Sequence, residues 1–145
     1  MKTVALRYAE NFAPECGTIA AHQKVIEREG SVWYGKFGNP LSALVAREIL
    51  KAETPRILLI RSGGVERWWA HVEDIQRERP DESLIPSYYN SVGDKFKCWF
   101  HVTRFERAPQ DVMSHCVVAS SGRTLSNASR HSMSPYFIVD YDESF

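Results

Sequence analysis

The chain has 145 residues, 43% hydrophobic and 25% charged, values that fit one soluble domain and exclude a disordered or fibrous protein. Its 18 basic and 18 acidic side chains cancel, which argues against sequence-blind nucleic-acid binding, because that mode needs excess positive charge. The 3 cysteines argue against a disulfide framework, and the sequence has neither a signal-peptide pattern nor an apolar run of membrane length. We therefore expect a cytoplasmic protein.

The first third of the chain alternates strand and helix patterns. A strand is predicted over 3–9 and a loop over 11–17. A helix follows over 19–29 with Thr18 as its N-cap, and the apolar stripe of this helix includes His22. We expect His22 to be buried against the sheet, near the strand that carries Trp33. It is then either a core histidine bonded to backbone or a pocket-lining one.

A strand over 31–37 comes next, followed by a second helix. Asn39 and Pro40 are residue types preferred at the N-cap and at the first position of a helix, and Thr54-Pro55 ends it. The continuous apolar run over 56–61 is typical of a central strand covered on both faces.

Longer strand patterns fill the remainder. The run Ser62-Gly63-Gly64 predicts a tight hairpin turn leading into a strand over 65–75. After an irregular excursion, a long strand is predicted over 96–107, with one helical turn over 110–115 and a last strand over 136–141. The pattern indicates an α+β fold: a twisted, partly closed β-barrel of about five to six strands with helices packed over it. We expect one domain over residues 1–145.

Cysteine and histidine side chains give only weak signals for catalysis or metal binding. Cys98 and His101 lie three apart in a strand, so they point to opposite faces, and His115-Cys116 has the same geometric problem. Structural zinc usually takes a close ligand pair from a turn rather than from mid-strand. A His-x-Thr motif of the phosphoesterase type at His101 lacks its second copy. We therefore expect no metal and no cofactor.

A second weak signal is the serine- and arginine-bearing segment over 120–134. Ser120-Ser121-Gly122-Arg123 could hold a phosphate through backbone N–H groups and a guanidinium, or it is a solvated loop.

The aromatic residues give the strongest signal. They make up 12% of the chain, with 4 Trp and 6 Tyr, several of them in adjacent pairs. Neighbouring strand residues face opposite sides, so each pair places one ring inside and one outside or toward a cleft. Flat rings near basic side chains suit a nucleobase, which binds by stacking and edge hydrogen bonds, while core packing alone stays an open alternative.

Taken in order, three segments resemble the EVE domain, a member of the PUA-like superfamily, which includes readers of modified nucleobases. The first is Val32-Trp33-Tyr34-Gly35-Lys36-Phe37-Gly38-Asn39, followed by a short helix and the apolar strand that ends in Ser62. The others are the segment over 70–81, which ends in Pro80-Asp81, and the Arg/Ser-rich stretch over 129–135, which ends in Ser-Pro. Together they span roughly residues 31–137.

Two features depart from the family pattern. Lys36 and Phe37 stand before Gly38-Asn39, where the family usually carries an Arg-Asn pair, and the extension over 3–29 is longer than expected. The Gly-x-Lys-x-x-Glu-x-Arg pattern of the related ASCH hydrolases is absent.

The resemblance implies a nucleic-acid-binding module that holds a nucleobase, modified or not, in an aromatic pocket; the ligand is DNA, RNA or a nucleotide. The expected base-binding residues are His22, Trp33, Tyr34, Lys36, Ser62, Trp68, Trp69, Tyr88, Tyr89 and Trp99, and the expected phosphate-binding residues are Arg123, Arg130 and Ser132. One alternative is a small hydrolase or nucleotide-processing enzyme with Lys36, His22 or Glu73 as acid or base. Another is a protein-interaction module anchored by surface aromatics.

Overall fold

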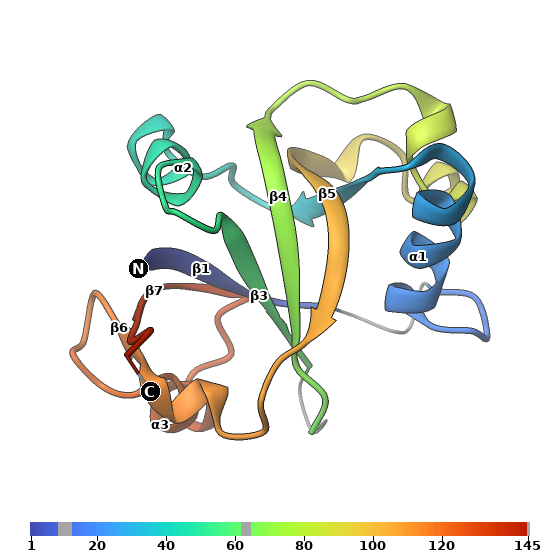
Figure 1. Ribbon diagram of the computed structural model, residues 1–145. Coiled ribbons are helices and arrows are strands. Elements are labelled where there is room, and N and C mark those ends of the chain that lie inside the picture. Colours follow the sequence, from blue (N-terminus) through green and yellow to red (C-terminus); the bar gives the residue numbers. More distant parts are fainter. Residues whose placement is uncertain (9–12, 62–64, 145) are drawn as a thin grey trace.

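The computed structural model describes residues 1–8, 13–61 and 65–144, so the predicted hairpin turn at 62–64 lies outside the described residues. The fold is α+β (Figure 1). The strands are β1 (Lys2–Arg7), β2 (Val32–Phe37), β3 (Arg56–Ile60), β4 (Trp68–Gln76), β5 (Phe96–Arg107), β6 (Cys116–Val118) and β7 (Tyr136–Tyr141). The α-helices are α1 (Thr18–Glu29), α2 (Ala43–Leu50) and α3 (Leu125–His131), and the 3-10 helices are η1 (Glu82–Leu84), η2 (Ser87–Lys95) and η3 (Val112–His115).

The strands form one sheet in the order β2-β5-β4-β3-β1-β7-β6. Only β1 and β3 pair in parallel, because α1, β2 and α2 lie between them in the chain, and every other neighbouring pair is antiparallel. The sheet is not closed, since β2 and β6 are its two edges. The expected partly closed barrel of about five to six strands is therefore corrected to an open sheet of seven strands.

Each of the six predicted strand regions contains a strand, and the unpredicted strand is β6. With 3 residues, β6 is too short to show alternation, and it exists because it pairs with β7. The segment expected to be irregular before β5 contains η1 and η2, and the serine-rich segment contains α3.

Both faces of the sheet are buried, and alternate residues of each strand supply them. One face forms a core under α1 and α2, with residues such as Leu6, Ile57 and Phe100. The opposite face divides into two clusters, one built around Trp69 below α3 and η3, and one built around Trp99 below η1 and η2. In the view of Figure 1, α2 lies to the left of the strands β4 and β5 and α1 lies to their right. The prediction that the third strand is central is confirmed, because β3 lies between β4 and β1.

The predicted N-cap of α1 is wrong by one residue, and that of α2 is wrong by three residues. Thr18 is the first residue of α1 rather than its cap, because Gly17 occupies the cap position with φ of 91°, a conformation that favours glycine. Ser42, not Asn39, caps α2, because its hydroxyl accepts the Val45 N–H at 3.2 Å. In the described part of the chain, no helix is long and apolar enough to cross a membrane.

Candidate functional site

A small pocket of about 90 Å³ lies between the C-terminal end of β1 and the edge strand β2. Residues of η2, the first residue of β5, the first residue of α1 and Pro135 also line it. One water molecule needs roughly 10–15 Å³ of such space, so the pocket has room for one small ring rather than a length of polymer. We call it the aromatic pocket after the six rings that the described residues contribute to its wall, which are Tyr8, Tyr34, Phe37, Tyr88, Tyr89 and Phe96.

Gly35 sets the shape of one wall of the aromatic pocket. A Cβ atom at this position would lie 2.6 Å from Cγ of Phe96, so only glycine lets the Phe96 ring lie against the strand. That ring is packed between Phe37 and Tyr89, with ring centroids 4.4 Å and 4.5 Å away. The close approach of ring to backbone therefore holds the aromatic wall in place.

A buried hydrogen-bond chain supports the pocket from behind. Nδ1 of His22 lies 2.8 Å from the Thr18 carbonyl, which only accepts, so Nδ1 carries the proton. Burial lowers the pKa of His22 to about 4, so the ring is neutral and its Nε2 accepts from the Tyr89 hydroxyl at 2.7 Å. The Tyr89 oxygen in turn accepts the N–H of Gly35 at 3.2 Å. The chain ties α1, η2 and β2 together through neutral groups.

The expected burial of His22 is confirmed. Its side chain is fully buried, bonded to backbone, and its ring centroid lies 5.1 Å from that of Tyr34 on β2. The wall of the pocket contains Tyr34 and Tyr89, and His22 lies behind them rather than in the wall.

Two basic side chains, Arg7 and Lys36, belong to the pocket wall, and the described wall residues include no carboxylate. Arg7 donates to the carbonyls of Ser129, Ser132 and Ser134 at 2.8–2.9 Å. It thereby ties the end of β1 to the segment that connects α3 and β7. The Lys36 ammonium is buried, and it donates to two carbonyls that follow it in the chain.

The structure separates the predicted aromatic residues into four places. Tyr34, Tyr88 and Tyr89 meet in the aromatic pocket, together with Lys36. Trp33 and Trp99 point to the other face of β2 and β5, behind Tyr89 and Phe96, where Trp33 stacks on His101 with ring centroids 4.5 Å apart.

The remaining two tryptophans lie elsewhere in the sheet. Trp69 is buried under Arg56, whose guanidinium is 4.4 Å from the ring, and Trp68 packs against the core below α1 and α2. The seven predicted aromatic residues therefore do not all line the aromatic pocket, because strand alternation places neighbours on opposite faces. Ser62, the last predicted base-binding residue, lies outside the described residues.

A second hollow, open and about 900 Å³ in volume, runs between α3, β7 and the turn after β6. Two of the three expected phosphate-binding residues, Arg123 and Ser132, line it, and Ser120, Ser121 and His131 do so as well. Arg130 is exposed in the last turn of α3 and is not part of this lining. We call this hollow the hydroxyl groove.

The groove and the aromatic pocket lie on either side of one chain segment. Ser134 and Tyr136 line the hydroxyl groove, and Pro135 between them lines the pocket. The Lys36 ammonium lies 4.2 Å from the centre of the Tyr136 ring, so that ring separates the pocket's lysine from the groove.

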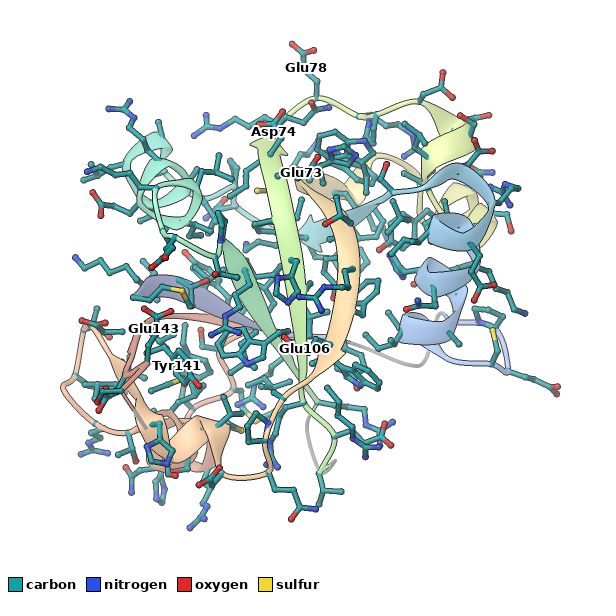
Figure 2. The ribbon with its side chains drawn as sticks, in the orientation of Figure 1. Glu73, Asp74, Glu78, Glu106, Tyr141 and Glu143 are labelled. Carbon is teal, nitrogen blue, oxygen red and sulfur yellow. The ribbon has the colours of Figure 1, made fainter. Side chains whose placement is uncertain are left out.

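The described side chains that the catalytic alternatives would use do not come together in one site. Burial raises the pKa of Cys98, and raises that of Cys116 to about 12, so both thiols are protonated. Among the described residues, no group of three His, Cys, Asp or Glu side chains could hold a metal ion. Glu73 is exposed beside Asp74 at one end of β4 (Figure 2) and is not in the pocket wall with Lys36.

The acidic residues at the other end of the sheet serve in ion pairs. Arg56 lies between Glu106 and Glu143, labelled in Figure 2, at 3.8 Å and 3.9 Å. His71 contacts the same Glu106 carboxylate at 3.0 Å and lowers its pKa. This group lies on the Trp69 side of the sheet and lines neither hollow.

Comparison with known proteins assigns the chain to a family. A family model named Pua-like matches residues 4–143, which is nearly the whole chain. The chain belongs to the Pua-like family. Searches of curated proteins and of solved structures find no significant match. The Pua-like assignment confirms the superfamily that the sequence motifs indicated, and the EVE subdivision stays a prediction.

Sequence reasoning missed several residues of this Pua-like pocket. Gly35 lies in the Trp-led segment that carries the family resemblance. The role of its missing side chain depends on Phe96, which is 61 positions away in a different strand. Arg7 had no local signal, because its three carbonyl partners lie more than 120 positions further along the chain. Tyr8 lies near the end of the strand predicted over 3–9, and nothing in the local sequence indicated that it would line a pocket with residues of η2.

Proposed function

We propose that this Pua-like domain binds one nucleobase of a nucleic acid in the aromatic pocket. The observation that carries the proposal is the pocket itself: six rings enclose a space for a single flat ring, and two basic side chains stand in its wall. Rings of this kind bind bases by stacking, and a base inside a duplex would first have to be extruded from the stack. Membership of the Pua-like family supports the same function.

The hydroxyl groove supports a place for the phosphates of the same strand. It adjoins the pocket across Pro135, it is open, and it presents serine hydroxyls with Arg123 and His131. Hydroxyl and guanidinium groups are common donors to phosphate oxygens. We propose that Arg123 and Ser132 contact phosphate there, with Arg130 nearby on α3, and that residues 1–145 act as one domain of EVE type that reads a modified base.

Binding and turnover decide between this function and its alternatives. The intrinsic tryptophan fluorescence is titrated with modified and unmodified nucleosides and with short DNA and RNA oligonucleotides, because the Trp99 ring lies 5.9 Å from Tyr89. The expected result is saturable binding with no product. Product formation would favour the hydrolase, and no response to any of these ligands would favour the protein-interaction module.

A matched pair of variants tests the location of the binding site. Tyr88 and Trp68 are both half-buried aromatic residues, but only Tyr88 lines the pocket. Tyr88→Ala should weaken binding by about 1–3 kcal/mol, the usual cost of one stacking ring. Trp68→Ala should leave it unchanged. Equal losses in the two variants would place the base elsewhere.

A further inference from the structure

Lys36 is the most unusual charged group of the molecule. Its residue is 6% exposed, and no carboxylate lies within ion-pair distance of its ammonium among the described residues. Buried lysines are normally paired, because taking an ammonium out of water is costly unless a negative charge accompanies it. Lys36 is instead one of the residues that line the aromatic pocket, and its ammonium lies against backbone carbonyls and the Tyr136 ring.

The hydrogen bonds of Lys36 leave it only partly satisfied. An ammonium has three N–H donors. Two of them go to the carbonyls of Phe37 at 3.1 Å and Asn39 at 2.6 Å, and the charge also lies over the Tyr136 ring. The described residues supply no acceptor for the third. Carbonyls and a ring face attract the charge but do not neutralise it.

The described residues around Lys36 supply no negative charge. Cys98 lies directly opposite Lys36 in the β2–β5 ladder, but burial raises the pKa of its thiol, which therefore stays neutral. Burial also lowers the pKa of Lys36 itself, which is the direction expected for an ammonium without a counter-ion. The hydroxyls of Tyr34 and Tyr89 are phenols, and the described wall of the pocket contributes no acid.

A second feature of the pocket favours negative charge. Thr18, the first residue of the 12-residue helix α1, is part of the pocket wall, so the positive end of the helix dipole lies there. The N-cap residue, Gly17, has no side chain, and the first turn of the helix contains no acidic residue. Lys36 and the N-terminal end of α1 come from different elements, and both contribute positive charge.

We infer that the aromatic pocket selects flat rings that present an anionic or strongly accepting oxygen, such as a ring carboxylate or an oxo group, to the Lys36 ammonium, and that it rejects cationic rings. The inference rests on the proposed function and names the class of base. Among modified bases it favours carboxylated over methylated pyrimidines, and it excludes bases that carry a fixed positive charge. A charge-assisted hydrogen bond of this kind corresponds to about 10- to 100-fold in affinity.

The experiment compares ligands that match in shape and differ in charge. The dissociation constants of the natural chain are measured for 5-carboxycytidine against 5-methylcytidine, for cytidine against 3-methylcytidine, which is cationic at neutral pH, and for benzoate against benzamide. The carboxylates should bind about 10- to 100-fold more tightly than their neutral matches, and 3-methylcytidine should bind more weakly than cytidine. Lys36→Met removes the charge at similar size and should abolish these differences, while Lys36→Arg should retain them.

The outcomes separate the inference from the proposed function. If nucleosides bind but each carboxylate binds no better than its neutral match, or if Lys36→Met leaves the ratios unchanged, the inference is overturned and the proposed function stands. If benzoate is preferred over benzamide through Lys36 but no nucleoside or oligonucleotide binds, the inference stands and the proposed function fails. Thermal unfolding of Lys36→Met shows whether it folds; we expect no loss of stability, because a buried unpaired charge is removed.

Discussion

The aromatic pocket and the hydroxyl groove lie side by side but differ in almost every physical property. The pocket is small, its rings are packed on one another, and its polar groups are tied into backbone by hydrogen bonds. The groove is about ten times larger and is lined by exposed or half-buried hydroxyls, with Arg123 fully on the surface. Under the proposed function, the two regions have different tasks: the pocket selects the base by ring stacking and by the Lys36 charge, and the groove adds salt-dependent contacts to phosphate.

The largest expected effect concerns the pocket's neutral histidine and pH. His22 has a pKa of about 4 in the folded protein, below its ordinary 6.5, so the unfolded chain binds the proton more readily. Stability from this group is therefore complete above pH 6.5 and is lost as the pH falls toward 4, by about 3 kcal/mol in total. Urea unfolding at a series of pH values measures this slope.

The control is His22→Gln, which cannot titrate. Exposed carboxylates with a lowered pKa, such as Asp81 and Asp142, also lose stability in acid, and they do so equally in both proteins. The difference between the two pH profiles isolates His22. Parallel profiles between pH 6.5 and 4 would contradict a buried neutral histidine.

Gly35→Ala should break the pocket wall at its tightest point. The new Cβ would lie 2.6 Å from the Phe96 ring, which Phe37 and Tyr89 prevent from turning away. We expect a loss of about 1–3 kcal/mol in the free energy of unfolding, as for other overpacked sites, together with loss of base binding. The double variant Gly35→Ala/Phe96→Val should be more stable than the sum of the two single changes predicts. Strict additivity would show that the two residues do not touch.

Tyr89→Phe should break the hydrogen-bond chain behind the pocket without changing the shape of the pocket. It leaves the N–H of Gly35 and Nε2 of His22 without their buried partner, at a cost of about 1–2 kcal/mol in stability. Tyr136→Phe is the control, because its ring still lies under Lys36 and its hydroxyl takes part in no hydrogen bond among the described residues. Chemical denaturation of the two variants measures the difference, and equal stabilities would contradict the hydrogen-bond chain.

The smallest effect belongs to the groove. Arg123→Gln should leave stability and nucleoside affinity unchanged and should reduce the slope of log affinity against log salt by about 0.7–0.9, the contribution of one phosphate contact. Arg47→Gln on α2, remote from the groove lining, is the control. Affinity for one oligonucleotide at several salt concentrations measures both. With about two to four contacts the slope of the natural chain should be shallow, and a slope steeper than about −6 would contradict the division between pocket and groove.

Local patterns in the sequence determined the elements of this protein. Alternation and apolar runs located six of the seven strands, and the stripe on α1 placed His22 in the core. The Trp-led segment and the late Ser-Pro stretch pointed to the superfamily that the family model confirms. The strands and the buried face of α1 could be predicted because each depends on residues within one or two turns or strand repeats of each other, and the superfamily could be predicted because its segments follow one another in a fixed order along the chain.

Only the tertiary structure decided which side chains share a site. Alternation says that Trp33 and Tyr34 face opposite ways, but not that Tyr34 meets Tyr89 while Trp33 stacks on His101. Lys36 is buried with no carboxylate partner in the described part of the chain, and Arg7 bonds to three distant carbonyls. Both features depend on how the ends of β1, β2 and β7 approach one another. That approach is set by the twist and order of the sheet, which follow from the packing of all its strands at once. No local sequence pattern predicts it.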